Sequence, residues 1–170
     1  IYSLSKASKK ILARLPDRLI IKAYFTKDLP REYGLNRKYI EDLLSEYKVY
    51  SRGKIKFEFI DPSSDKELLS EARASGVIPV QFTQIERDKY ELKEGYMGIV
   101  FLFGPKKEVI PVVKSTEGLE YDITGKIKKL TSEKTKTIGF TTGHNETTEF
   151  GEMEQYIESQ YNIKRLEKDA

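Results

Sequence analysis

The chain has 170 residues, 38% of them hydrophobic and 34% charged, and its net charge is only +3. This suits one domain of ordinary size with an additional segment, and the mixed charges form no basic stripe that would favour nucleic-acid binding. The absence of cysteine excludes thiol redox chemistry, thiolate nucleophiles, cysteine-bound zinc and disulfides. No run approaches the ~18 apolar residues of a membrane span. Because the chain begins at Ile1, we expect it to belong to a longer protein.

The first 25 residues predict a helix and a buried strand. Apolar residues recur at helical spacing over 4–15, where Ser3 or Ser5 serves as the cap and Pro16 ends the helix. The apolar run at 18–25 then predicts the strand.

A second helix and a second strand follow. Asn36 is predicted to cap the helix and Gly53 to end it, and the alternation over 54–60 predicts the strand. A strand-helix-strand unit normally makes a parallel pair. We therefore expect 18–25 and 54–60 to be parallel, and to be central neighbours of a later strand at 97–103.

The middle of the chain predicts a third helix and a hairpin. Ser64 and Glu67 have the spacing of a capping box for the helix. From Pro79 the apolar period changes to two, so 80–93 predicts a hairpin that turns at Arg87 and Asp88.

Residues 97–103 are continuously apolar, which is typical of a central strand buried on both faces. Pro111 in the returning strand lacks a donor, so that strand is expected at an edge of the sheet or with a break. A fourth helix is predicted by an apolar stripe of Leu119, Ile123, Ile127 and Leu130. The polar stretch 131–137 is interpreted as a linker.

The last part of the chain predicts the truncated beginning of a second α/β domain at 138–170. A strand, a loop, a helix and the start of another strand bury too little surface to fold alone. The apolar face of Phe150, Met153 and Ile157 favours docking on the first domain or self-association.

The order of elements over the first 130 residues resembles a thioredoxin-like α/β domain with a mixed sheet, flanking helices and an extra hairpin. In such folds a reactive dithiol follows the first central strand. Here the corresponding loop reads "YFTKDLP" and holds no sulfur. The usual activity is therefore impossible, and a binding or packing module is expected, although fold alone does not determine function.

The single histidine, His144, lies between Gly143 and Asn145 and close to Glu146. A metal site needs three or four converging ligands, and catalysis by a Ser-His-Asp set cannot be argued from one histidine without a "GxSxG" motif. A turn that enters the second domain is the favoured interpretation, with a metal ligand or a catalytic base as alternatives.

Two further pairs are candidate interaction or structural residues. Asp61 and Pro62 end the second strand, where aspartate is typical of a turn or cap. Glu120 and Tyr121 begin the fourth helix, where a carboxylate suits the helix dipole. We expect no catalytic, cofactor-binding or metal-binding residue in this chain.

Motifs across nearly the whole chain resemble the GldG-like auxiliary proteins of gliding-motility-associated ABC transporters. In order they are "YSLSKASKKIL", "IKAYFTKDLP", "LLSEYKVYSRGKIKFEFIDP", "GVIPVQF", "GYMGIVFLFG", "EVIPVV", "GLEYDITGKIKKLT" and "TIGFTTGHNE". The family pattern usually has glycine where Asn145 stands.

The resemblance implies a non-enzymatic protein anchored in the cell inner membrane, with its soluble part facing the periplasm. Its partners would be the permease and ATPase subunits of an ABC transporter. Residues 1–132 would be a thioredoxin-like extracytoplasmic domain, and 138–170 would open a domain that resembles glutamine amidotransferases without their catalytic residues.

Two alternatives remain open. One is a hydrolase or amidotransferase-like enzyme whose active site is completed beyond residue 170. The other is a cytosolic thioredoxin-like binding domain.

Overall fold

The computed structural model describes residues 3–132, 137–142 and 162–167. The chain divides into two compact units, Ile1–Thr131 and Ser132–Ala170, and each is described by itself. The described part contains no helix that is both long enough and apolar enough to cross a membrane.

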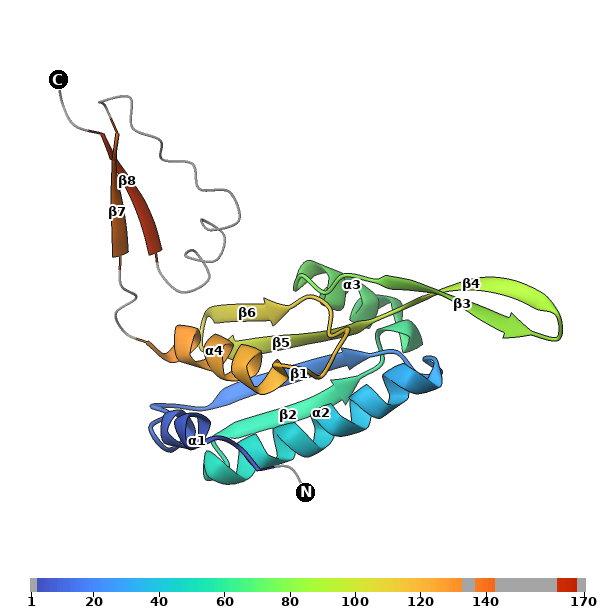
Figure 1. Cartoon of the computed structure of the whole chain (residues 1–170), viewed down its shortest axis with the longest axis horizontal. Coiled ribbons are helices and arrows are strands. Elements are labelled where there is room, and N and C mark those ends of the chain that lie inside the picture. Colours follow the sequence, from blue (N-terminus) through green and yellow to red (C-terminus); the bar gives the residue numbers. More distant parts are fainter. Residues whose placement is uncertain (1–2, 133–136, 143–161, 168–170) are drawn as a thin grey trace. The chain divides into compact units, whose positions relative to one another are not determined.

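The first unit is built on a four-stranded mixed sheet with the order β2-β1-β5-β6 (Figure 1). Strands β1 and β2 are parallel, whereas β5 is antiparallel to both β1 and β6. The α/β fold with a mixed sheet and flanking helices is thereby confirmed. The sheet strands are β1 (Leu19–Phe25), β2 (Ile55–Ile60), β5 (Met97–Phe103) and β6 (Lys106–Ile110).

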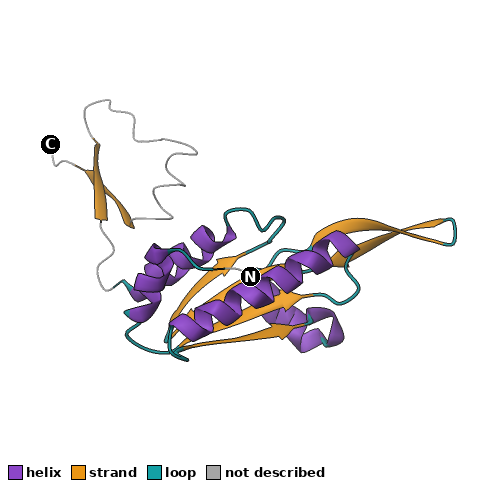
Figure 2. Cartoon of the chain, turned by 60° about the horizontal axis from the view of Figure 1, so that its bottom comes forward, coloured by secondary structure: helices purple, strands orange, loops and turns teal. Residues whose placement is uncertain are grey.

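Four helices flank this sheet (Figure 2). Helices α1, α2 and α4 share one apolar core with residues of β1, β2 and β5. Helix α3 contributes to a smaller cluster on the other face, around Tyr24 and Val100. The helices are α1 (Lys6–Ala13), α2 (Arg31–Tyr50), α3 (Lys66–Ala74) and α4 (Leu119–Thr131), and a 3-10 turn, η1, covers Pro62–Ser64.

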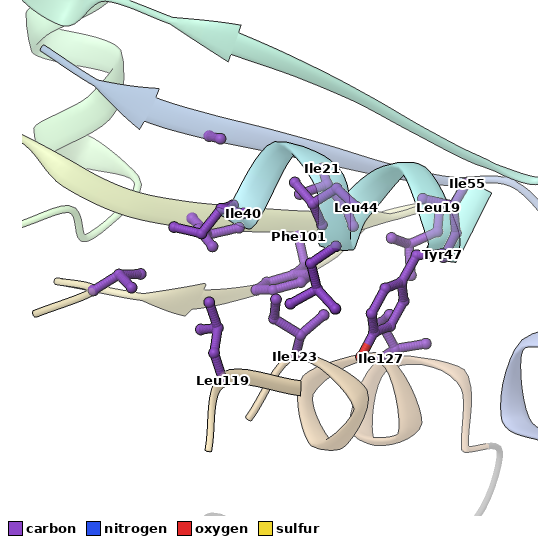
Figure 3. Close-up of a cluster of buried hydrophobic side chains, with 14 of the residues drawn as sticks. Leu19, Ile21, Ile40, Leu44, Tyr47, Ile55, Phe101, Leu119, Ile123 and Ile127 are labelled. Atoms are coloured by element: carbon purple, nitrogen blue, oxygen red, sulfur yellow. The ribbon is translucent and has the colours of Figure 1, made fainter. Parts of the chain in front are cut away.

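The main core is formed by alternate residues of the strands and by the predicted helical stripes (Figure 3). Ile21 of β1, Leu44 of α2 and Ile123 of α4 are each fully buried. Burial of such side chains stabilises the fold by about 1.5–3 kcal/mol apiece. The periodicity of each element therefore places its apolar face correctly, including the stripe on α4.

Strand β5 is central, as its continuous apolar run predicts, and β6 lies at the edge with Pro111 just after its last residue. The prediction that 54–60 is also central is wrong, because β2 forms the opposite edge. Apolar and charged residues alternate along β2, and the charged Lys56 and Glu58 are exposed. Such alternation is typical of a strand with one face open to solvent rather than of a strand buried on both faces.

Two predicted helix starts are wrong. Helix α2 begins at Arg31 with Pro30 as its N-cap residue, and Asn36 lies inside it. Proline is tolerated at a helix start because the amide that it lacks would have no partner within the helix there. Helix α3 is capped by Asp65, whose side chain accepts a hydrogen bond from the Glu67 amide at 2.9 Å. Ser64 instead belongs to η1 and donates to the Asp61 carbonyl.

Strands β3 (Val80–Glu86) and β4 (Lys89–Gly95) form a separate two-stranded antiparallel sheet, so the predicted hairpin is confirmed. Its turn residues Arg87 and Asp88 have φ values of 47° and 63°. Positive φ at both central residues is typical of the two-residue turn that matches the twist of a hairpin. We call residues 80–95 the arm, since it projects beyond the sheet (Figures 1 and 2).

The second unit contains the parallel pair β7 (Thr137–Thr142) and β8 (Asn162–Glu167), which confirms the two predicted strands. The predicted helix with Phe150, Met153 and Ile157 lies outside the described residues. The predicted linker 131–137 is too long at both ends. Thr131 still belongs to α4, where its hydroxyl donates to the Ile127 carbonyl, and Thr137 starts β7.

Candidate functional site

The carboxyl ends of the parallel strands β1 and β2 meet at one edge of the sheet, the usual place for ligands in α/β folds. We call this the loop edge; it comprises residues 26–30 and 61–62. The Asp61 carboxylate accepts a hydrogen bond from the Lys27 amide at 3.3 Å. It also accepts bonds from the amide (2.9 Å) and the hydroxyl of Ser63.

These bonds fix the charge and the role of Asp61. Partial burial raises its pKa, but the hydrogen bonds from Ser63 and from the Lys27 amide outweigh burial and lower the pKa below its ordinary value. The carboxylate therefore stays ionised at neutral pH, where it caps η1 and holds the loop after β1. Pro62 is buried as the first residue of that turn.

Thr26, the first residue of the loop after β1, is fastened to the start of β5. Its amide donates to the Tyr96 carbonyl at 3.0 Å, and its hydroxyl accepts from the Tyr96 amide at 2.9 Å. Both the amide and the hydroxyl of Thr26 are thus used within the chain. The start of this loop is therefore held by hydrogen bonds within the chain.

The loop edge also anchors the arm. A Cβ added at Gly95 would lie 2.6 Å from the Leu29 side chain and 3.0 Å from that of Phe82. Glycine at this position therefore lets the root of the arm pack directly on Leu29.

A buried polar network connects the first, second and fourth helices. The hydroxyls of Ser8 and Thr124 lie 2.8 Å apart, and those of Tyr47 and Thr124 lie 2.6 Å apart. The Glu120 carboxylate accepts from the Ser8 hydroxyl at 2.7 Å and from the Ser5 amide at 2.8 Å. Glu120 therefore ties the start of α1 to α4, which is a structural role.

Burial also raises the pKa of Tyr47, so its hydroxyl stays neutral and serves as a hydrogen-bonding group. Tyr121, the neighbour of Glu120, is 69% exposed. The structure thus places Asp61 with Pro62 at the loop edge, and Glu120 with Tyr121 at the start of α4. The two pairs lie in different environments. Gly143, His144 and Glu146 lie outside the described residues.

Two charged clusters fasten α3 to its surroundings. Glu71 accepts from the Lys22 ammonium at 2.6 Å and from the Tyr24 hydroxyl at 2.7 Å, and these bonds lower its pKa. Arg73 donates to Glu94 at 2.9 Å and to the Tyr96 hydroxyl at 2.8 Å. The second cluster joins α3 to the root of the arm.

Sequence reasoning missed both clusters and the buried network, because the hydrogen bonds that join one element to another connect residues 21 to 116 positions apart. Within residues 3–132, 137–142 and 162–167, no group of three histidines or acidic residues could hold a metal ion.

The comparisons with known proteins give a family and one distant relative. Residues 1–102 match the model of a family described as "Domain of unknown function (DUF7088)". The chain is also similar to an uncharacterized protein of Borreliella burgdorferi, with 25% identity over 142 residues. That match covers 84% of this chain but only 28% of the relative, so the chain spans less than a third of the relative's length. No solved structure matches the chain significantly.

Proposed function

The chain belongs to the DUF7088 family, and we propose that it is a non-enzymatic binding module of an ABC transporter of the gliding-motility-associated type. In this proposal residues 1–131 are a thioredoxin-like domain of a membrane-anchored protein. The soluble part faces the periplasm, and the protein assembles with permease and ATPase subunits.

The hydrogen bonds within the loop edge are the observation that supports the non-enzymatic part of the proposal. The hydroxyl of Thr26 accepts a hydrogen bond from the Tyr96 amide, and the Asp61 carboxylate accepts hydrogen bonds from the Lys27 and Ser63 amides. These bonds give both groups a role in stabilising the loop, and together with the absence of cysteine this supports a module that acts by binding. A scaffold of this kind is suited to binding through its surface.

The sheet order supports the thioredoxin-like interpretation. Two parallel strands joined through a helix lie beside an antiparallel pair, and a last helix returns to the sheet. The arm is inserted between α3 and β5. The transporter assignment rests on the order of the motifs shared with GldG-like proteins over nearly the whole chain.

The proposal is tested by purification of the full-length natural protein, with an affinity tag, from mildly solubilised membranes of its own cells. Mass spectrometry should find a permease and an ATPase of one ABC transporter enriched over a tagged, unrelated membrane protein of similar abundance. Recovery of the tagged protein without either transporter subunit would overturn the proposal.

A further inference from the structure

The outer part of the arm has one uncharged face, made of Thr83 and Ile85 on β3 and of Tyr90 and Leu92 on β4. The next pair on this side, Gln81 and Glu94, lies at the root of the arm, where Glu94 pairs with Arg73. Ile85 lies opposite Tyr90, and Thr83 lies opposite Leu92. Residues directly opposite in an antiparallel pair point to the same side of the sheet. These four residues, the arm face, therefore form one continuous surface.

The arm face is open to solvent. Ile85, Tyr90 and Leu92 are 64%, 80% and 66% exposed. Within the described part of the chain, β3 and β4 pair only with each other. A lone two-stranded hairpin is marginally stable in water, and clustered exposed apolar side chains typically mark an interaction site.

The opposite face of the arm has a different character. From the turn inward, its cross-strand pairs are Glu86 with Lys89, Gln84 with Glu91 and Phe82 with Lys93, so four of these six residues are charged. The register therefore separates a mostly charged face from the uncharged outer part of the arm face. An occupant of the arm face must itself be uncharged and apolar at its centre, because charged groups buried there would find no partner.

We propose that the occupant is the arm face of a second copy of this chain, packed face to face about a two-fold axis. A two-fold interface requires a self-complementary patch. The arm face meets this requirement, because two copies can bring their uncharged apolar side chains into contact without burying a charge. The arm as a whole carries three basic and four acidic residues, a net charge of −1, so two arms repel each other little.

The area indicates a weak dimer. Three side chains of this size and exposure offer roughly 400–500 Å² per copy, so two copies bury at most about 800–1,000 Å², in the range of weak, transient interfaces. The dimer should therefore be reversible and depend on concentration. This inference does not depend on the transporter assignment.

The first test is sedimentation equilibrium of the 170-residue chain from about 5 to 500 μM, a range that brackets micromolar affinity. The mean mass should rise from monomer towards dimer. The double variant Tyr90→Ser with Leu92→Ser should raise the dimer dissociation constant at least about tenfold. The control Glu91→Ser, on the charged face of the same strand, should leave it unchanged. A monomer at every concentration would overturn the proposal, as would equal effects of both changes.

The second test keeps the face nearly intact and uses the absence of native cysteine. Single cysteines are placed in turn at residues 90, 91, 92 and 93, and disulfide-linked dimers are followed under mild oxidation. Cross-linking should alternate, fast at 90 and 92 and slow at 91 and 93. Equal rates at all four positions, or faster rates at 91 and 93, would contradict face-to-face packing.

Discussion

Replacing Gly98 by alanine should destabilise the first unit, because this residue of the central strand β5 has no room for a methyl group. A Cβ there would lie 2.5 Å from the Val77 side chain and 2.9 Å from the Pro111 carbonyl oxygen. The carbonyl is backbone and also accepts a hydrogen bond from the Ile78 amide. Relief of the clash therefore requires Val77 to move and the segment at Pro111 to shift.

Overpacking of a well-filled core costs ~1–3 kcal/mol, and the backbone contact places Gly98→Ala in the upper part of that range, about 2–3 kcal/mol. Gly34→Ala is the matched control. That glycine lies in α2 with nothing within 4 Å of an added Cβ, so alanine should stabilise by about 0.5–1 kcal/mol. Urea unfolding followed by circular dichroism measures both changes. A Gly98→Ala variant as stable as the wild type would refute the packing argument.

Three further predictions concern the described contacts. Tyr47→Phe should lower the free energy of unfolding in urea by about 1–2 kcal/mol, because it removes a buried hydrogen bond to Thr124. The control Tyr121→Phe, at an exposed position, should leave the free energy of unfolding unchanged. Glu71 has a pKa below its ordinary value of 4.5, so its pairing with Lys22 stabilises the fold above that pH and is lost as the pH falls through the folded-state pKa. The stability difference between wild type and Glu71→Gln should therefore shrink from pH 7 to pH 3, and a constant difference would contradict this assignment. A chain ending at residue 131 should keep a single cooperative unfolding transition, because its core residues all precede that point; loss of folding would show that the chain is one cooperative unit.

Much of the fold follows from local patterns in the sequence. The continuous apolar run at 97–103 predicts the central strand, and the stripe from Leu119 to Leu130 predicts the buried face of α4. The change of period at Pro79 predicts the arm. The errors concern boundaries and neighbours. Helix α2 begins directly after Pro30, earlier than the predicted cap at Asn36. The edge position of β2 depends on which strands pair with β1, and local periodicity does not determine that pairing.

The candidate residues were harder to predict than the fold. The position of Asp61 after a strand indicates a cap, but its bond to the Lys27 amide joins residues 34 positions apart. The network of Ser8, Tyr47 and Thr124 gives no local signal, because each member resembles an ordinary polar residue on its own helix. The arm face does have a signal: apolar residues alternate with charged ones on β4, and the turn at Arg87 sets the register.

The proposed assembly makes residues 1–131 the module through which the protein joins the transporter, with the ATPase held through the permease. It is tested most directly by quantitative co-purification from native membranes of the full-length protein with and without this module, the anchor and all other segments being kept. Deletion of the module should lower the recovery of the permease and the ATPase at least about tenfold. Unchanged recovery of both subunits would contradict it.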